Sequence, residues 1–329
     1  MQLSIIIINY KSPELIIDCL TSIYAETKGI SYEILIVDNH SQDNSKQLIM
    51  QQYPEVTWIE MPYNSGFSRA NNAGIKVAKG QYVLLLNSDT IILENALDKI
   101  IHYVEQNKNV VAASVQLLNA DLTPQNAGNY FVKGGLNILL TLPVINVFIK
   151  KLALLFKVIK PSIVSSSTIN YVDWISGAFM LVKKTVIDNS GLMDEDFFLF
   201  SEEIEWCSRL RKYGEIAVYT NIKTIHLEGG TTKKFATNVV KNYFEYWTPK
   251  GAQLMLSNLL RIRKQYSIFW MFCNFMIYIV EIPILLLAAV FSAKYTFANV
   301  KAYTKNVVKM FKYIPIIIRN KSYFYKIMS

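Results

Sequence analysis

Short apolar runs alternate with segments of helical spacing through the first 116 residues of the chain. The apolar runs have the length of buried strands, whereas the segments between them place apolar residues every three or four positions. Strands are predicted over residues 3–8, 33–37, 56–60, 82–86 and 110–116, and helices over residues 13–26, 45–52, 68–79 and 94–106. This alternation is typical of an α/β fold with a mostly parallel sheet and flanking helices.

The alternation breaks after residue 116. Residues 136–156 are apolar, with Lys150 and Lys151 near their end, and residues 161–168 have a loop-like composition. Strand and helix patterns then return: we predict a buried strand over 174–183, a helix over 202–213, and short strands over 216–219 and 224–226. The apolar stretch is therefore expected to be an insertion within one α/β domain.

Residues 267–293 are almost wholly apolar, interrupted only by Glu281 and Pro283. The segment is long enough to span a membrane. Basic residues flank both ends, however, and a single span would place eight positive charges on the outer side, against the usual distribution. Because Pro283 offers a break, we expect a re-entrant hairpin or interfacial helices with both ends on the cytoplasmic side. A buried core helix is the alternative.

Positive charge is concentrated at the C-terminal end of the chain. The net charge is +9, and from residue 294 to residue 329 there are eight basic residues and no acidic one. Basic residues beside a strongly apolar segment are typical of proteins that bind an anionic membrane surface. A nucleic-acid-binding protein would instead need a basic face on its folded domain. We therefore expect a membrane surface as a partner and no nucleic acid.

The three cysteines, Cys19, Cys207 and Cys273, are far apart and lack metal-ligand spacing. This usage is typical of a reducing compartment. The chain opens on a strand pattern without a basic n-region, so we expect no signal peptide and a cytoplasmic location for the catalytic part.

The run over residues 82–86 ends abruptly in Asn87, Ser88 and Asp89. Ligands of open α/β sheets bind at the carboxyl ends of the strands. A carboxylate there, with amide and hydroxyl neighbours, suits a hard divalent cation that already carries phosphate oxygens. The triplet therefore predicts a site for a phosphorylated ligand with its metal ion.

Polar residues also follow other predicted strands. Asn9 and Tyr10 end the first, and Asp38 ends the second, where it either accepts hydrogen bonds from a base or ribose or only caps a turn. Asn64 and Gly66 precede a helix whose free N–H groups suit an anion. In that helix Asn71 adds an amide, and Arg69 either contacts a phosphate or is solvated. The absence of G-x-G-x-x-G after the first strand and of G-x-x-x-x-G-K-[ST] argues against a dehydrogenase and a P-loop NTPase.

These motifs together resemble those of family 2 glycosyltransferases with the GT-A fold, in particular the rhamnosyltransferase-like group that builds bacterial surface polysaccharides. The second half of the chain contains further segments that resemble motifs of this family. They are Trp174-Ile175-Ser176-Gly177-Ala178-Phe179-Met180, Gly191-Leu192-Met193-Asp194-Glu195-Asp196-Phe197-Phe198, Ser201-Glu202-Glu203-Ile204-Glu205-Trp206 and His226. The resemblance covers about residues 3–230. It implies a GT-A domain over 1–235, with a nucleotide-binding half (1–116) and an acceptor half (117–235) carrying the 136–156 insertion, followed by a helical membrane-associating region over 236–329.

The resemblance implies an inverting transfer of rhamnose or a similar sugar from a nucleotide-diphosphate donor. The implied acceptor is a polyprenyl-linked glycan of O-antigen or capsule synthesis at the cytoplasmic face of the plasma membrane. Mg²⁺ or Mn²⁺ is the implied cofactor, with Asp89 and His226 as metal contacts; a surface histidine is the alternative for His226. The implied donor site comprises Asn9, Tyr10, Asp38, Asn64, Gly66, Arg69, Asn71, Asn87, Ser88, Trp174, Gly177 and Glu202. Many relatives have Asp where Asn87 stands, so we expect the donor's phosphates to hold much of the metal.

The resemblance also implies a general base. In the family it is the Asp of a Glu-Asp pair at a helix start, and here Glu203 takes that place, with a side chain longer by one methylene. The alternative is that the acidic residues only favour a helix N-terminus. Two other functions remain open: transfer from a UDP-hexose or UDP-N-acetylhexosamine, and a non-catalytic GT-A domain that binds a nucleotide or glycan.

Overall fold

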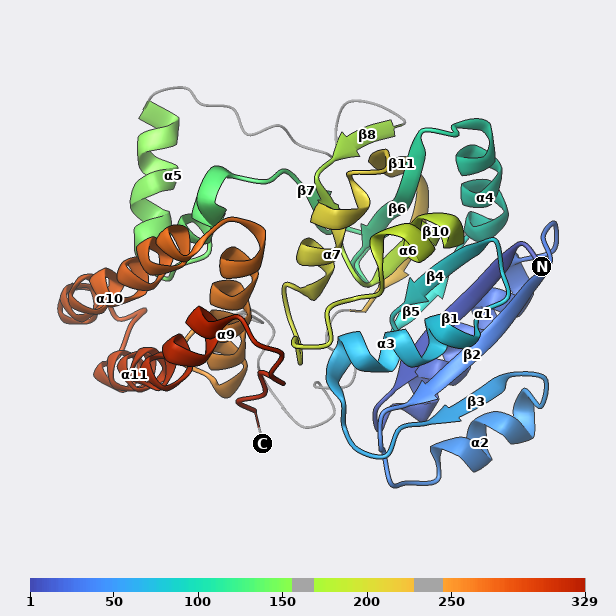
Figure 1. The fold of residues 1–329 in the computed structure, drawn as a ribbon, viewed down its shortest axis with the longest axis horizontal. Coiled ribbons are helices and arrows are strands. Elements are labelled where there is room, and N and C mark those ends of the chain that lie inside the picture. Colours follow the sequence, from blue (N-terminus) through green and yellow to red (C-terminus); the bar gives the residue numbers. More distant parts are fainter. Residues whose placement is uncertain (156–168, 228–244, 329) are drawn as a thin grey trace. The chain divides into compact units, whose positions relative to one another are not determined.

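A computed structural model of the chain describes residues 1–155, 169–227 and 245–328 (Figure 1). The chain separates into two compact units. The first unit comprises the described residues within Met1–Tyr130, Ser162–Asp194 and Trp206–Val239, and the second those within Phe131–Pro161, Glu195–Glu205 and Val240–Ser329. The domain boundary predicted at residue 235 and the loop predicted over 161–168 lie outside the described residues.

The first unit is built on a sheet of nine strands among the described residues. Its N-terminal strands pair in parallel in the order β3 (Thr57–Glu60), β2 (Tyr32–Asp38), β1 (Leu3–Asn9) and β4 (Tyr82–Leu86). Beyond β4 follow β10 (Phe179–Lys183), β6 (Val110–Leu118), β11 (Glu215–His226) and β5 (Thr90–Ile92), and β8 (Ile169–Val172) pairs with β11. The predicted α/β class is confirmed. The antiparallel strands β5 and β8 were not predicted, and β10 lies within the strand predicted over 174–183.

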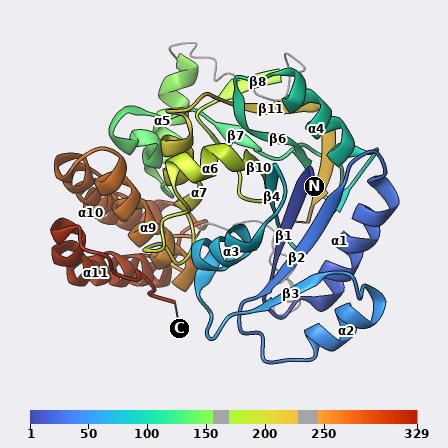
Figure 2. The same ribbon diagram turned by 45° about the vertical axis from the view of Figure 1, so that its right-hand side comes forward.

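Helices cover both faces of this sheet (Figure 2). The helices α1 (Pro13–Glu26) and α4 (Ala96–Gln106) lie on one face, and α3 (Gly66–Val77) lies on the other. The helix α2 (Ser45–Gln52) packs against α1, and α6 (Lys184–Ser190) against β10. The apolar face of each helix closes one core with the buried strands. The parallel order of β2, β1 and β4 therefore brings three carboxyl strand ends to one edge of the sheet.

Three predicted strands differ from the structure. The predicted strand over 174–183 is divided into β9 (Trp174–Ile175) and β10, because β9 pairs with the separate strand β7 (Gly128–Asn129) while β10 enters the main sheet. The two short strands predicted over 216–219 and 224–226 form the single strand β11, whose pairing with β6 is irregular between Tyr219 and Lys223. In both cases the partner strand, which is distant in sequence, sets the boundary.

The second unit is helical. Its described elements are a 3₁₀ segment η1 (Lys133–Leu140), α5 (Ile145–Leu155), the first turn of α7 (Glu202–Leu210), α9 (Pro249–Gln265), α10 (Ile268–Phe291) and α11 (Phe297–Arg319). The helix α10 continues through Pro283, so the hairpin predicted to break there is not formed. Within the described ranges, α10 is the single unbroken helix whose length and composition would allow it to cross a membrane.

Candidate functional site

Asp38 and Asn9 meet at the carboxyl ends of β2 and β1. The parallel register places the two residues opposite each other, and the Asn9 amide donates to Asp38 Oδ1 at 2.7 Å. The backbone N–H of Ser41 donates to Asp38 Oδ2 at 3.0 Å, and the Ser41 hydroxyl accepts from Asn9 at 3.1 Å. Asp38 therefore does cap its turn. Each carboxylate oxygen has a second acceptor position, so the cap does not exclude a nucleoside contact.

The loop before α3 is held open by side-chain hydrogen bonds. Asn39 accepts from the backbone and hydroxyl of Ser65 at 2.8 Å each and donates to Asn64 Oδ1 at 3.2 Å. Gly66, with φ 75°, starts the helix in a conformation that side-chain-bearing residues avoid. The backbone N–H groups of Ser65 and Gly66 donate to the side-chain oxygens of Asn39 and Asn64, so an anion would have to approach the N–H groups that follow in α3.

The other polar residues of this region have local partners. Arg69 donates to the Tyr63 hydroxyl at 2.7 Å, and the buried amide of Asn71 donates to the carbonyl of Phe67 in its own helix at 3.1 Å. Tyr10 is 43% exposed. The donor roles of Tyr10, Arg69 and Asn71 stay predictions, and the amide of Asn71 bonds within its own helix.

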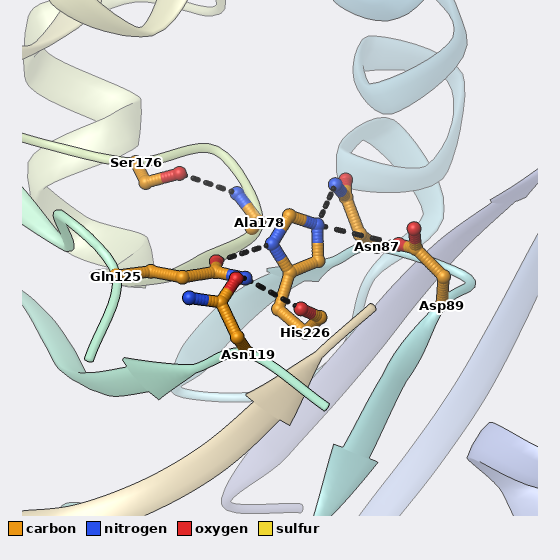
Figure 3. Close-up of polar contacts among 7 residues, drawn as sticks. All are labelled: Asn87, Asp89, Asn119, Gln125, Ser176, Ala178 and His226. Atoms are coloured by element: carbon orange, nitrogen blue, oxygen red, sulfur yellow. Dashed lines mark hydrogen bonds and ion pairs between the residues drawn. The ribbon is translucent and has the colours of Figure 1, made fainter. Parts of the chain in front are cut away.

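Asn87, Asp89 and His226 come together beyond the end of β4 (Figure 3). The short strand β5 pairs antiparallel with the end of β11, so that His226 lies opposite Thr90, next to Asp89. His226 Nε2 is 3.1 Å from the Asn87 amide nitrogen and 3.3 Å from Asp89 Oδ1. Both ionisable side chains are largely buried, with exposed fractions of 11% for His226 and 9% for Asp89. Residues predicted from two distant motifs therefore form one cluster.

The turn between β9 and β10 borders this cluster. The backbone N–H of Asn87 donates to the carbonyl of Ala178 at 3.0 Å, and Ala178 N–H bonds the Ser176 hydroxyl at 3.3 Å. The same turn contains Gly177, and Trp174 lies in β9 before it. Gly177 and Ser88 are partly exposed, so this side of the cluster is accessible to a ligand.

Gln125 is a member of the cluster that the sequence did not reveal. Its amide lies between His226 Nδ1, at 2.9 Å, and the His226 carbonyl, at 2.6 Å (Figure 3). Gln125 follows the break in the strand-helix pattern, and no motif or periodicity marks it. Its position depends on a hydrogen bond from its backbone N–H to the carbonyl of Leu117, at the end of β6.

Glu202 and Glu203 lie in the second unit, in the first turn of α7. Burial, reinforced by the charge of Glu203, raises the pKa of Glu202 well above its ordinary value. Burial also raises the pKa of Glu203, although Arg261 of the same unit opposes this rise. Phe200 and Ser201 precede them in left-handed backbone conformations, φ 74° and 67°. Such strain is often stored near functional residues.

The residues at the end of β4 fit a divalent cation only in part. Within residues 1–155, 169–227 and 245–328, no three His, Cys, Asp or Glu side chains gather as a metal site. One carboxylate, of Asp89, and one imidazole, of His226, face each other at 3.3 Å. Mg²⁺ is commonly bound by one or two carboxylates together with substrate phosphates. The cluster therefore suits a cation that arrives with a phosphorylated ligand.

Sequence comparisons relate part of the chain to known proteins. Residues 4–159 match the sequence model of "Glycosyl transferase family 2". The low-salt glycan biosynthesis hexosyltransferase Agl10 of Haloferax volcanii is 28% identical over 64% of this chain and 62% of its own length. The poly(ribitol-phosphate) beta-glucosyltransferase of Bacillus spizizenii is 38% identical over 33% of this chain and 18% of its own length. The chain thus spans less than two thirds of either relative.

A solved structure shows the same fold. The mannosyltransferase PcManGT from Pyrobaculum calidifontis, in complex with GDP-Man and Mn²⁺, superposes with a TM-score of 0.53 over 97% of this chain and 83% of its own, at 14% identity. At that identity the likeness concerns the fold alone. Together with the sheet described above, this likeness shows a GT-A-like fold, and residues 4–159 are similar in sequence to family 2 glycosyltransferases.

Proposed function

We propose that this chain transfers a hexose from a nucleotide-diphosphate donor to a growing glycan, with inversion at the anomeric carbon. The observation that carries the proposal is the cluster of Asn87, Asp89 and His226 at the end of β4, on the sheet edge where Asn9 and Asp38 also meet. This edge is where α/β sheets bind nucleotides. The hexosyltransferase Agl10 and the glucosyltransferase of Bacillus spizizenii support the reaction class.

Each part of the proposed site has a separate task. Asp38 accepts hydrogen bonds from the nucleoside, and the N-terminus of α3 with Asn64 and Gly66 receives the diphosphate. Asp89 and His226 would hold Mg²⁺ or Mn²⁺ together with donor phosphates, and a cation held there would supply positive charge near the leaving diphosphate. Glu203 accepts the proton of the acceptor hydroxyl.

The donor we propose is a nucleotide-linked rhamnose or a similar sugar, and the acceptor a polyprenyl-linked glycan of a bacterial surface polysaccharide. A thermal-shift screen of dTDP-rhamnose, UDP-hexoses, UDP-N-acetylhexosamines and GDP-mannose with Mg²⁺ or Mn²⁺ tests the first part. One stabilising donor identifies the sugar class, because a ligand that binds only the folded state raises the melting temperature. If no nucleotide sugar stabilises the protein, the proposed function is wrong. Binding without hydrolysis or transfer would instead indicate the non-catalytic alternative.

Asp38→Ala is expected to weaken binding of the free nucleoside diphosphate even without metal. Loss of a charged acceptor typically costs about 1.5–3 kcal/mol, which corresponds to roughly a 10- to 150-fold higher Kd. Calorimetry in the presence of a chelator measures this directly. Asp43→Ala, which removes another acidic cap of the same loop, is the matched control and should leave the affinity unchanged. Unchanged affinity in Asp38→Ala removes this residue from the site.

We also propose that the second unit binds an anionic membrane surface with α10 lying along it. Every exposed residue of α10 is apolar: Ile268, Phe269, Phe272, Met276, Val280, Pro283, Leu286, Leu287, Val290 and Phe291. The buried side of the helix contains polar residues among apolar ones. Glu281 accepts from the N–H groups of Val144 and Ile145, and Asn274 donates to the carbonyl of Gly134. Such one-sided exposure is typical of an interfacial helix rather than a spanning one.

The neighbouring helix α11 carries positive charge, which an anionic membrane surface attracts. Lys301, Lys305, Lys309, Lys312 and Arg319 are exposed at helical spacing, beside the exposed apolar Phe297, Val308 and Phe311. The helices α10 and α11 pack together, for example through the edge-to-face rings of Phe275 and Phe311, 4.9 Å apart. Each basic residue near an anionic surface contributes about 1 kcal/mol. The second unit therefore exposes apolar side chains on α10 and basic side chains on α11, the two kinds of residue that bind an anionic membrane surface.

Sedimentation with vesicles tests this surface. We expect binding to vesicles that contain anionic lipid, weaker binding at high salt, and loss of binding in the double variant Leu287→Glu/Phe291→Glu. Val77→Glu is the matched control, because Val77 is an exposed apolar residue of α3 in the first unit. Recovery of all the full-length protein in the soluble fraction at low salt, with no vesicle binding, would contradict the proposal.

A further inference from the structure

The imidazole of His226 is fixed from both sides by amide side chains and a carboxylate (Figure 3). Nε2 faces Asn87 and Asp89, and Nδ1 faces Gln125. We propose that Gln125 is a positioning residue that holds neutral His226 as the Nδ1–H tautomer and so directs the Nε2 lone pair toward Asp89. The role of this lone pair in metal binding rests on the proposed function, whereas the tautomer follows from hydrogen-bond chemistry alone.

The orientation of the Gln125 amide follows from the backbone. One terminal atom of this amide is 2.6 Å from the carbonyl oxygen of His226. A carbonyl only accepts hydrogen bonds, so this atom must be the nitrogen, and the other terminal atom is the oxygen. That oxygen is 2.9 Å from His226 Nδ1. Because an amide oxygen also only accepts, Nδ1 must carry the proton.

A chain of side chains gives the same orientation from the other end. The Asp121 carboxylate accepts from the Thr123 hydroxyl at 2.5 Å, and the hydroxyl oxygen then accepts from the Asn119 amide nitrogen at 2.9 Å. This leaves the Asn119 oxygen to accept from Gln125 Nε2, at 2.8 Å. The hydrogen bonds from Thr123 lower the pKa of Asp121, which keeps it an ionised acceptor. Every hydrogen bond in this chain of side chains therefore points the same way, with the donor on the side of His226 and the acceptor on the side of Asp121.

The Nδ1–H tautomer determines what the other ring nitrogen, Nε2, can bind. With its proton on Nδ1, the neutral imidazole accepts at Nε2 from the Asn87 amide, 3.1 Å away, and presents its lone pair beside the Asp89 carboxylate, 3.3 Å away. Two electron-rich atoms at this distance suit a cation. In the other tautomer Nε2–H would donate to Asp89 and both would be lost as ligands. Histidines that bind metals are usually held in this way through their second nitrogen.

Nitrogen NMR of protein labelled with ¹⁵N-histidine tests the tautomer directly. The chain has three histidines, His40, His102 and His226, so the signals can be assigned by single substitutions. At a pH of about 8.5, where ordinary imidazoles are neutral, we expect His226 to show a protonated Nδ1 and an unprotonated Nε2. Once the signals are assigned, a protonated Nε2 in neutral His226 of the wild-type protein overturns the inference.

Gln125→Met then tests the cause. This nearly isosteric change removes the acceptor, and we expect the His226 proton to move to Nε2, where it bonds Asp89. Gln125→Glu keeps an acceptor oxygen and should therefore keep the proton on Nδ1, although it loses the donor to the His226 carbonyl. The matched control is Gln106→Met, because Gln106 bonds the exposed imidazole of His102 at 2.8 Å and lies outside the cluster. An Nδ1–H signal that persists in Gln125→Met shows that Gln125 does not set the tautomer.

Metal-dependent binding provides the second readout. Loss of such a supporting hydrogen bond typically weakens metal affinity about 10- to 100-fold, so the Mn²⁺ concentration needed to promote nucleoside-diphosphate binding should rise by this factor in Gln125→Met. Binding in chelator should not change. An unchanged Mn²⁺ requirement after a tautomer switch overturns the role toward the metal. A wild-type protein that binds no nucleotide would instead refute the proposed function and leave the tautomer result standing.

Discussion

Asp89→Ala is expected to weaken nucleotide-sugar binding by about 100-fold in the presence of Mg²⁺ or Mn²⁺, equivalent to about 2.7 kcal/mol. Asp89 is the only acid of the triplet after β4, since Asn87 and Ser88 are neutral. Without its carboxylate, the imidazole of His226 is the sole remaining strong ligand of the cluster, and the donor's phosphates must hold the cation almost alone. Titration calorimetry of the nucleoside diphosphate with and without chelator measures the effect.

The two conditions of this titration separate metal binding from general damage. In chelator the variant and wild type should bind the nucleotide equally weakly. Glu94→Ala is the matched control, because Glu94 is an exposed acidic residue of the same region whose ion pair with Lys99 is long, at 3.7 Å. It should bind the nucleotide like wild type in both conditions. Equal donor affinity of Asp89→Ala and wild type in metal would exclude Asp89 as a metal contact.

Glu203→Gln is expected to lower kcat by about 10²- to 10⁴-fold, the range that general-base catalysis contributes, and to leave donor affinity unchanged. The substitution keeps the size of the side chain and removes its ability to accept a proton. A transfer assay with the donor identified by the screen gives kcat, and calorimetry gives the donor Kd. Glu195→Gln changes an exposed acid a few residues earlier and should have no effect on either.

The pH dependence of transfer provides an independent check of Glu203. Burial raises the pKa of this carboxyl, and only the ionised form accepts a proton. Activity should therefore fall as the pH is lowered through a pKa above the ordinary glutamate value of about 4.3. Near-wild-type turnover by Glu203→Gln would show that another group is the base, and loss of donor binding would show a binding role instead.

The elements of the sheet were predictable because their signals are local. The apolar run of β1, the proline at the start of α1 and the periodic spacing of α4 each reflect residues that are neighbours in sequence. The division of β9 from β10 was not predictable, since it depends on pairing with β7 and β4. The continuity of α10 through Pro283 was likewise hidden, because a proline signals a break unless packing by other helices supports the turn.

The candidate site, like the fold, was predictable from the sequence only in part. Asp38, Asp89 and His226 were selected because they match motifs of the family that the chain resembles. The roles proposed for them, an acceptor for a nucleoside and ligands for a cation, are roles that carboxylates and imidazoles can fill. The sequence pattern did not show that these side chains lie close together. The distance of 3.3 Å between Asp89 and His226 exists because β5 pairs with the end of β11.

The sequence alone determined most of the strand and helix order in the first 116 residues, the apolar segment and the basic residues near the C-terminus, and the motifs that resemble those of family 2 glycosyltransferases. These properties are set by side-chain type and by spacing over a few residues. Only the tertiary structure decided which distant side chains touch. Gln125 shows this most clearly: no local signal marks it, yet the strand pairing that places His226 puts the Gln125 amide against both the ring and the carbonyl of that residue, where hydrogen-bond direction fixes a proton.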